Sequence, residues 1–219
     1  MNESDYKITP LWATPLFQST LKNIPQECKD YIMKNVEYKR YPANNGFGSK
    51  SKFLLDIQAL APLKKVLTDV THEYLYKILD IDESADFQMT NSWSVKHIKG
   101  DEAGQHHHAN SMLSGILYLQ TDEKTGDVLF VKERNHFPLF NDTIQIPFKG
   151  NNYNLYNVEG WAIKPRNNQL LLFPSQLRHE VYPNESDTER YCIAFNFFAF
   201  GKFGYDDQVQ LGIKDVTRD

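Results

Sequence analysis

The sequence has little cysteine and no long apolar run, and each absence excludes a class of protein. Its two cysteines, Cys28 and Cys192, lie far apart and form no CxxC or Cys–His motif, so we expect two reduced thiols rather than a disulfide framework. No apolar segment approaches the ~20 residues that cross a bilayer, and the N-terminal segment MNESDYKITP is polar. We therefore expect a cytoplasmic protein, or one in the host cytoplasm if its source is viral, with no membrane partner.

The chain also lacks an excess of basic residues, internal repeats and flexible linkers. Its formal net charge is −4 and no basic stripe is visible, which argues against nucleic acid as a partner. We expect a single domain over residues 1–219, with an N-terminal strand and helices in 1–85 and a β-rich core in 86–219. The sequence leaves the oligomeric state open.

Aromatic residues, by contrast, are abundant. The chain is 41% hydrophobic and contains 14 Phe and 12 Tyr, which is enough for a sizeable core and typical of a sheet-rich protein. After residue 86, short apolar stretches alternate with turns rich in Gly, Asn, Asp and Pro, a pattern that predicts a mainly β fold, an antiparallel barrel or jelly roll. The predicted strands are Phe87–Ile98, Ser114–Leu119, Asp127–Val131, Thr143–Phe148, Gly160–Ile163, Gln169–Phe173, Arg178–Tyr182 and Tyr191–Phe200.

Two helical patterns precede the strands. The first runs from about Pro25 to Tyr38, and the second begins at Pro62, which suits a first helical turn, and continues to Ile78 with apolar residues at helical spacing. The segment Tyr41–Lys50 between them is rich in Gly and Asn and is predicted to be a loop. We expect both helices to cover one outer face of the barrel.

Three of the seven histidines are consecutive and stand just before an apolar strand. Side chains alternate along an extended segment, so His106 and His108 share one face and His107 points to the other. Two imidazoles on one face can chelate a single metal, and a third ligand must come from elsewhere. We interpret the isolated histidines as structural or exposed, namely His72, His97 and His136.

His179 is the natural third ligand, because it follows the apolar strand Leu170–Phe173 after a short turn containing Pro174. A barrel brings such a late strand beside an early one. Three imidazole or carboxylate ligands on one face leave open positions for a co-substrate and dioxygen, as non-haem iron requires. Arg190, eleven residues further on, opens the next strand and offers a planar fork for a carboxylate.

These motifs resemble the iron(II)/2-oxoglutarate-dependent dioxygenase superfamily, in its prolyl-hydroxylase-like branch, and are most similar to 2-oxoglutarate oxygenases of bacteria and marine phages. Those proteins carry His-x-His-Pro-x-Ser, then Ser-Gly-Val-Tyr-Tyr-Leu, and later Leu-Leu-Phe-Pro-Ser-x-Leu-x-His-x-Val before an arginine. The likeness covers most of the chain and is strongest from Asn91 to Phe198. The matching segments here begin at His106 (HHHANS), Ser114 (SGILYL), Leu171 (LLFPSQLRHEV) and, for the opening strand, Thr9 (TPLWATPL).

The resemblance implies a double-stranded β-helix, a cupin-like jelly-roll barrel, with iron at its mouth. His106 and His179 match metal ligands, Arg190 matches the residue that binds the far carboxylate of 2-oxoglutarate, and Tyr118 matches a tyrosine that hydrogen-bonds the same group. It further implies Fe(II), 2-oxoglutarate, dioxygen and optionally ascorbate as cofactors, with no catalytic residue beyond the metal centre. The implied activity is C–H hydroxylation, favouring a prolyl residue in a peptide or protein over a small molecule.

His108 departs from the usual pattern, since most of the superfamily has His-x-Asp or His-x-Glu. An imidazole in place of a carboxylate raises the net charge of the iron site by about one unit. We take a three-histidine centre as the first choice, because the phage-type relatives share this histidine. The alternatives are a frame of His108 with Asn110, or a carboxylate from Asp101 or Glu102.

Two rival functions fit part of this pattern. A cupin-like metalloenzyme that does not use 2-oxoglutarate also places three histidines on a barrel, but it has no need for Arg190. A non-catalytic metal-binding module is the other. Two polar segments could form the lips of a substrate site, Tyr41–Lys52 and Lys132–Asn157, and two aromatic residues could line its pocket or belong to the core, Trp93 and Phe195.

Overall fold

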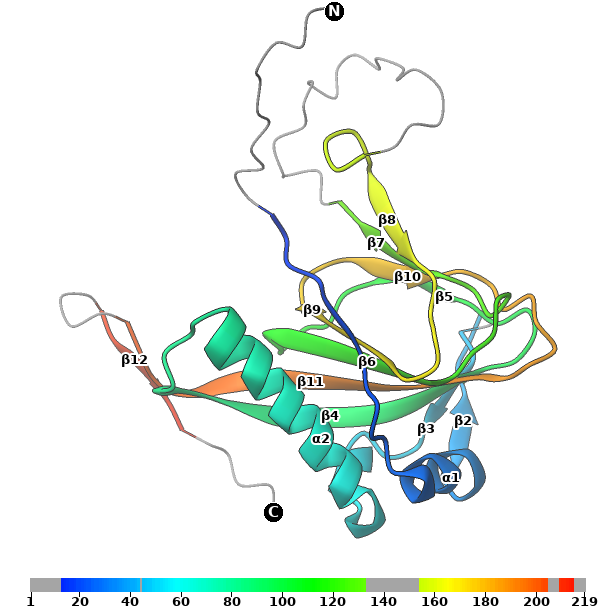
Figure 1. Cartoon of the computed structure of the whole chain (residues 1–219), viewed down its shortest axis with the longest axis horizontal. Coiled ribbons are helices and arrows are strands. Elements are labelled where there is room, and N and C mark those ends of the chain that lie inside the picture. The colour runs from blue at the N-terminus through cyan, green and yellow to red at the C-terminus, as the bar shows by residue number, and fades with distance from the viewer. Residues whose placement is uncertain (1–12, 44, 133–153, 205–208, 215–219) are drawn as a thin grey trace, which may run out of the picture.

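Two antiparallel sheets face each other in the computed structural model, which describes residues 13–43, 45–132, 154–204 and 209–214 (Figure 1). The larger sheet has the order β1-β9-β6-β11-β4-β3-β2, with β12 beside β11, and the smaller has the order β5-β10-β7-β8. The larger sheet comprises β1 (Phe17–Thr20), β2 (Tyr38–Arg40), β3 (Phe47–Ser49), β4 (Ala85–His97), β6 (Leu113–Gln120), β9 (Gln169–Pro174), β11 (Arg190–Phe203) and β12 (Leu211–Ile213). The smaller comprises β5 (Ala103–His106), β7 (Val128–Val131), β8 (Gly160–Ile163) and β10 (His179–Val181).

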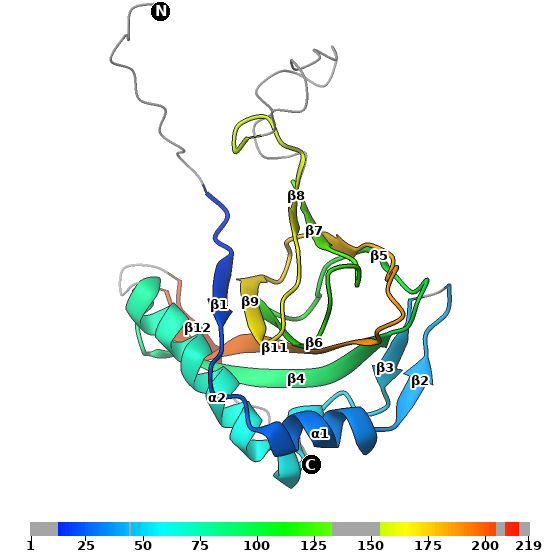
Figure 2. The ribbon, with the colours of Figure 1, turned by 45° about the vertical axis from the view of Figure 1, so that its right-hand side comes forward.

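The helices cover the outer face of the larger sheet, as the sequence predicted. Figure 2 shows α1 (Gln26–Lys34) and α2 (Ala61–His72) beneath β4, with β5 and β7 on the opposite side. Each helix buries a pair of residues one turn apart, Cys28 with Ile32 and Leu63 with Leu67. Two short 3₁₀ turns precede α2, η1 (Leu54–Asp56) and η2 (Gln58–Leu60), and a π-helix (η3, Glu73–Ile78) continues it.

Strand β11 is buried on both faces, which explains its almost unbroken apolar sequence. Tyr191, Ile193 and Phe195 belong to the core that the sheet shares with the helices, whereas Cys192 belongs to a second core between the two sheets. The two faces separate because successive side chains of a strand point in opposite directions. The chain therefore has a mainly β fold with two cores, and the inner one adjoins the candidate site.

The strands predicted after residue 86 are present in the structure where they fall on described residues, while Thr143–Phe148 lies outside them. The opening strand expected from Thr9 begins only at Phe17, because residues 13–16 are not in a strand. The prediction of a plain loop at Tyr41–Lys50 is wrong, because β3 forms within it and pairs with β2 and β4. Gly48 makes this possible, since a Cβ there would lie 2.0 Å from the Tyr41 hydroxyl. Strands β2, β5 and β12 were not predicted either, and each is only three or four residues long.

Both cysteines are free and buried, as expected for reduced thiols. Within the described ranges, no helix has the length and apolar character required to cross a membrane.

Candidate metal centre

The structure brings three of the predicted histidines together where the smaller sheet faces the larger. His106 ends β5 and His179 begins β10, and these two residues are direct partners in the antiparallel register. His108 lies two residues beyond the end of β5, where its backbone N–H donates to the Ser175 carbonyl at 2.9 Å. The potential ligand atoms of the three imidazoles all lie within 4.8 Å of one another, a spacing that could hold one metal ion.

Hydrogen bonds set the tautomer of all three imidazoles. Nδ1 of His106 lies 2.8 Å from the Gly104 carbonyl, and Nδ1 of His179 lies 2.9 Å from the Leu177 carbonyl. Nδ1 of His108 lies 2.8 Å from the side-chain oxygen of Asn196. Because these oxygens accept, each Nδ1 carries the proton and each Nε2 keeps a lone pair for a metal.

Burial keeps two of the imidazoles neutral, the form that binds metal. Burial and the neighbouring His106 lower the pKa of His179 to about 3. Burial also lowers the pKa of His108, although its hydrogen bond to Asn196 acts in the opposite direction. A metal would therefore not have to displace a proton from either residue near neutral pH.

A buried polar network holds His108 from the larger sheet. Ser114 Oγ lies 2.8 Å from His108 Nδ1 and donates to the side-chain oxygen of Asn196 at 2.7 Å. Asn196 in turn donates to the side-chain oxygen of Asn91 at 2.8 Å. The sequence reading missed this network, although a serine and an asparagine inside otherwise apolar strands were a visible signal. Such supporting groups orient a ligand and tune its basicity.

The alternative ligands lie apart from the three histidines. Asp101 is buried and forms an ion pair with Arg40, 2.6 Å between Nη2 and Oδ1, and it accepts a hydrogen bond from the Ile98 N–H at 3.0 Å. Glu102 and Asn110 are exposed, and Asn110 has a left-handed backbone with φ of 54°. Among the described residues, His106, His108 and His179 form the cluster suited to a metal, with no carboxylate in it.

A cavity of about 80 Å³ runs from the three histidines into the space between the sheets. Alternate residues of the long strands line its floor because they share one face. These residues are Trp93, Val95 and His97 of β4, Ile116 and Tyr118 of β6, and Arg190, Cys192 and Ala194 of β11. Ala103 of β5 and Val181 of β10 line the opposite wall.

Arg190 lies in this cavity, buried and only 2% exposed. Its Nη1 donates to the carbonyls of Thr125 and Gly126 at 3.1 and 3.2 Å, and its Nη2 donates to His97 Nδ1 at 2.6 Å. These partners are neutral, and no ion pair joins Arg190 to a carboxylate among the described residues. A buried cation without a counter-ion is costly, so this position favours the arrival of an anion.

Two further polar atoms of the cavity lining are buried and have no hydrogen-bond partner in the part of the chain that the structure describes, the Tyr118 hydroxyl and Nε2 of His97. Burial raises the pKa of Tyr118, so its phenol keeps its proton and can donate. Buried polar atoms are rarely left unpaired in native proteins. Together with Arg190, which has no carboxylate partner among the described residues, they form a polar group in the cavity that could bind an anion such as a carboxylate.

Of the two alternatives for His97, structural or exposed, the structure shows the first. His97 is 1% exposed and is bonded to Arg190, its direct partner in the register of β4 and β11. His72 is structural as expected, with Nε2 2.7 Å from the Phe87 carbonyl, and His136 lies outside the described residues.

The two aromatic candidates, Trp93 and Phe195, lie in different parts of the protein. Trp93 lines the cavity with its ring 5.5 Å from that of His108, whereas Phe195 is fully buried in the core beneath the helices. Lys52, at the end of the Tyr41–Lys52 segment, places Nζ 5.6 Å from the Trp93 ring. This segment therefore reaches the lining of the cavity, while most of Lys132–Asn157 lies outside the described residues.

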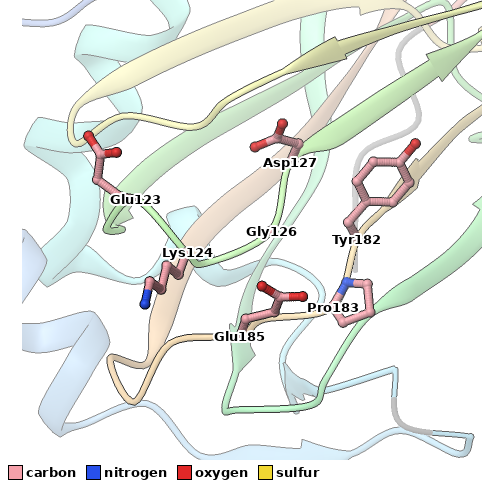
Figure 3. A pocket seen from close by; sticks show the side chains of 7 residues that line it. All are labelled: Glu123, Lys124, Gly126, Asp127, Tyr182, Pro183 and Glu185. Carbon is pink, nitrogen blue, oxygen red and sulfur yellow. The ribbon is translucent and has the colours of Figure 1, made fainter.

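A larger hollow of about 300 Å³ is lined in part by the loop whose carbonyls hold Arg190. Figure 3 shows its lining, which carries the carboxylates of Glu123, Asp127 and Glu185 around Gly126. It contains none of the histidines. The two cavities are connected through Gly126, which lines the larger hollow and whose carbonyl accepts a hydrogen bond from Arg190.

Comparison with known proteins agrees with this geometry. Residues 91–196, which include the three histidines and Arg190, match the family described as "Putative 2OG-Fe(II) oxygenase". No curated protein matches the chain in sequence.

Several solved structures share the fold at low identity. HygX from Streptomyces hygroscopicus, with nickel and 2-oxoglutarate bound, has a TM-score of 0.55 and 11% identity over 84% of this chain and 82% of that one. A prolyl-4-hydroxylase from Pseudomonas putida has a TM-score of 0.52 and 14% identity over 84% and 92%. The epimerase SnoN of nogalamycin biosynthesis has a TM-score of 0.56 and 11% identity over 84% and 78%. The fold is therefore the double-stranded β-helix that the family resemblance implied.

Proposed function

We propose that this chain is an iron(II)- and 2-oxoglutarate-dependent oxygenase. The observation that carries the proposal is Arg190, a buried arginine that forms no ion pair among the described residues and lines the same cavity as three imidazoles whose Nδ1 atoms are hydrogen-bonded to oxygen atoms. The imidazoles suit ferrous iron, and the guanidinium suits a carboxylate. The family match over residues 91–196 supports the same conclusion.

Each group has a distinct task in this proposal. The Nε2 atoms of His106, His108 and His179 hold Fe(II), while Arg190 and the Tyr118 hydroxyl bind the far carboxylate of 2-oxoglutarate. Bound together, the metal and the co-substrate supply the oxidation of a substrate C–H bond by dioxygen, with ascorbate as an optional reductant. The chain itself orients these groups, and the apolar side chains of the cavity lining exclude water.

We propose C–H hydroxylation as the reaction, with a prolyl residue in a peptide or protein as the favoured substrate and a small molecule as the alternative. Trp93 supports this choice, because its ring lines the cavity beside His108 and a flat aromatic surface suits a pyrrolidine ring. The fold is shared with a prolyl-4-hydroxylase and also with an epimerase. The mass of the product distinguishes these reactions, since hydroxylation adds one oxygen atom and epimerisation adds none.

The rivals predict different results. A cupin-like metalloenzyme has no use for a buried arginine that faces a carboxylate. A non-catalytic module binds a metal but forms no succinate from 2-oxoglutarate. The three hypotheses therefore differ most in the effect that they predict for replacing Arg190.

The test compares the wild type with Arg190→Ala and, as a matched control, Arg166→Ala, which removes an exposed arginine outside the cavity. Binding of 2-oxoglutarate to the Fe(II)-loaded protein is measured without oxygen, and succinate and product mass are followed with a peptide library once oxygen is admitted. We expect Arg190→Ala to weaken 2-oxoglutarate binding by about 2–5 kcal/mol while metal binding is unchanged. Arg166→Ala should behave as the wild type.

Equal binding by the wild type and Arg190→Ala would remove the main support for the oxygenase. Metal binding without succinate from any substrate, together with no affinity for 2-oxoglutarate, would favour the non-catalytic module.

A further inference from the structure

His97 lines the cavity together with Arg190 and Tyr118. It is the last residue of β4, lies directly opposite Arg190 in the sheet and is 1% exposed. It follows Trp93 and Val95 at two-residue steps along one face of the strand, so its side chain lines the same cavity. The Nε2 atom of His97 belongs neither to the metal centre nor to the hydrogen bonds that hold Arg190.

The bond to Arg190 determines which ring nitrogen of His97 carries the proton. A guanidinium only donates, so His97 Nδ1, 2.6 Å from Arg190 Nη2, must accept. The proton of the neutral ring therefore lies on Nε2. That N–H is buried and has no acceptor among the described residues. An unpaired buried donor at the edge of a cavity requires an acceptor from a ligand.

Charge and packing keep the ring in this state. Burial, Arg190 and Arg40 together lower the pKa of His97 to about 3, so the neutral form persists at any physiological pH. Gly46 closes over the ring on the side of β3, where a Cβ would lie 2.2 Å from Cδ2 and 2.8 Å from Nε2. Gly46 thus leaves room for this edge of the ring, and the rest of the His97 side chain lines the cavity, where a ligand could supply the acceptor.

We infer that His97 is a third binding residue for the far carboxylate of 2-oxoglutarate, donating from its Nε2–H beside the Arg190 guanidinium and the Tyr118 hydroxyl. This inference rests on the proposed function, because it assumes the same co-substrate in the same cavity. A carboxylate has about four lone-pair sites, which is enough for all three residues. Its arrival would supply an acceptor for the two unpaired donors and a counter-ion for Arg190.

Two substitutions separate the donor from the ring's role in holding Arg190. His97→Asn keeps an oxygen near the position of Nδ1, where it can still accept from Arg190, but it has no group at Nε2. His97→Gln places an amide N–H near the position of Nε2. If the donor matters, His97→Asn should bind 2-oxoglutarate roughly tenfold to a hundredfold more weakly, and His97→Gln should remain within about threefold of the wild type.

Binding is measured without turnover, on the Zn(II)-loaded protein, with 2-oxoglutarate and with 2-oxopentanoate, which has a methyl group in place of the far carboxylate. The loss in His97→Asn should appear with 2-oxoglutarate alone. In the wild type, the ¹⁵N-bound proton of His97, assigned by its absence from His97→Gln, should shift on addition of 2-oxoglutarate. His97→Asn lacks the same proton and can replace His97→Gln in the assignment, so the wild-type measurement needs only one of the two variants to fold.

Unchanged 2-oxoglutarate binding in His97→Asn, or an Nε2–H signal that does not respond to 2-oxoglutarate, would overturn the inference while leaving the oxygenase intact. Equal losses for both ligands would also overturn it, because they would indicate a general disturbance of the cavity. Failure of the wild type to bind 2-oxoglutarate at all would overturn the inference and the proposed function together.

Discussion

The two ends of the cavity differ in how far the chain itself satisfies their polar atoms. At the metal end, formed by His106, His108 and His179, each Nδ1 is hydrogen-bonded within the protein. At the anchor end, formed by His97, Tyr118 and Arg190, two buried polar atoms have no partner in the described structure and the arginine has no counter-ion. The metal end is thus oriented by the chain alone, whereas the anchor end is complete only with an anion. Substitutions at the two ends should therefore affect different ligands.

The largest expected effect is at the metal end. His179→Ala removes one of three ligands, so metal affinity should fall by more than the roughly 10- to 100-fold that loss of an outer partner costs. Isothermal titration with Fe(II) under anaerobic conditions measures this. His107→Ala is the matched control, because His107 is exposed and is not part of the cluster. If the two variants bound metal equally well, the three-histidine centre would be wrong.

A smaller effect is expected behind the metal end, at Asn196. Asn196→Ala removes the acceptor that orients His108, so metal affinity should fall roughly 10- to 100-fold, while any 2-oxoglutarate bound to the metal-loaded protein still meets an intact anchor end. Asn196→Asp keeps an acceptor and should retain most of the affinity. Metal titration of both variants checks this, and equal affinity of Asn196→Ala and the wild type would show that His108 needs no such support.

The anchor end should show itself in the pH dependence of stability. The pKa of His97 is about 3 in the folded chain against 6.5 for an ordinary histidine, so below about pH 6.5 the unfolded chain binds a proton that the folded chain does not. Its contribution to stability is complete above that pH and is lost as the pH falls toward 3. His97 should account for about 1.4 kcal/mol of this loss per pH unit, in addition to the loss from His179, whose pKa is lowered in the same way. Denaturant unfolding of the metal-free protein measures the sum, and the difference from His97→Asn gives the share of His97. His97→Asn should give a shallower dependence, and an identical slope would contradict the assignment.

The smallest effect is expected from packing at the anchor end. Gly46→Ala introduces a Cβ against the His97 ring at a backbone φ of 70°, so we expect a destabilisation of about 1 kcal/mol or more and weaker binding of 2-oxoglutarate. Gly104→Ala is the control, since its Cβ would meet nothing within 4 Å. Thermal unfolding and ligand titration measure both variants. If Gly46→Ala changed the metal affinity and not the 2-oxoglutarate affinity, the assignment of Gly46 to the anchor end would be wrong.

Local periodicity explains which parts of the site were predictable. His106 and His108 share a face because of strand alternation, and Arg190 opens an apolar strand. The histidine pair and the arginine could therefore each be predicted from a few neighbouring residues. The fold class followed from the same alternation. Tyr118 required the family resemblance, and its placement in the cavity agrees with it.

The remainder depends on contacts between distant segments. The role of His97 depends on its hydrogen bond to Arg190, 93 residues away in the sequence, and Asn196 supports His108 from 88 residues away. The backbone carbonyls of Thr125 and Gly126 that hold Arg190 have no side-chain signature at all. Strand β3 was missed because it exists by pairing with β4, not by an apolar pattern of its own.

Strand β11 also limits which changes of length this chain can tolerate. Arg190 and Cys192 line the cavity, while Tyr191 and Ile193 pack against the helices. Deleting or inserting one residue ahead of Arg190, with the hydrogen-bond register kept, would exchange the two sets and drive the guanidinium into the apolar core. Length variation in this strand is therefore confined to even steps or to bulges such as the one at Asn196/Phe197, so that related chains should preserve its parity even where they change its residues.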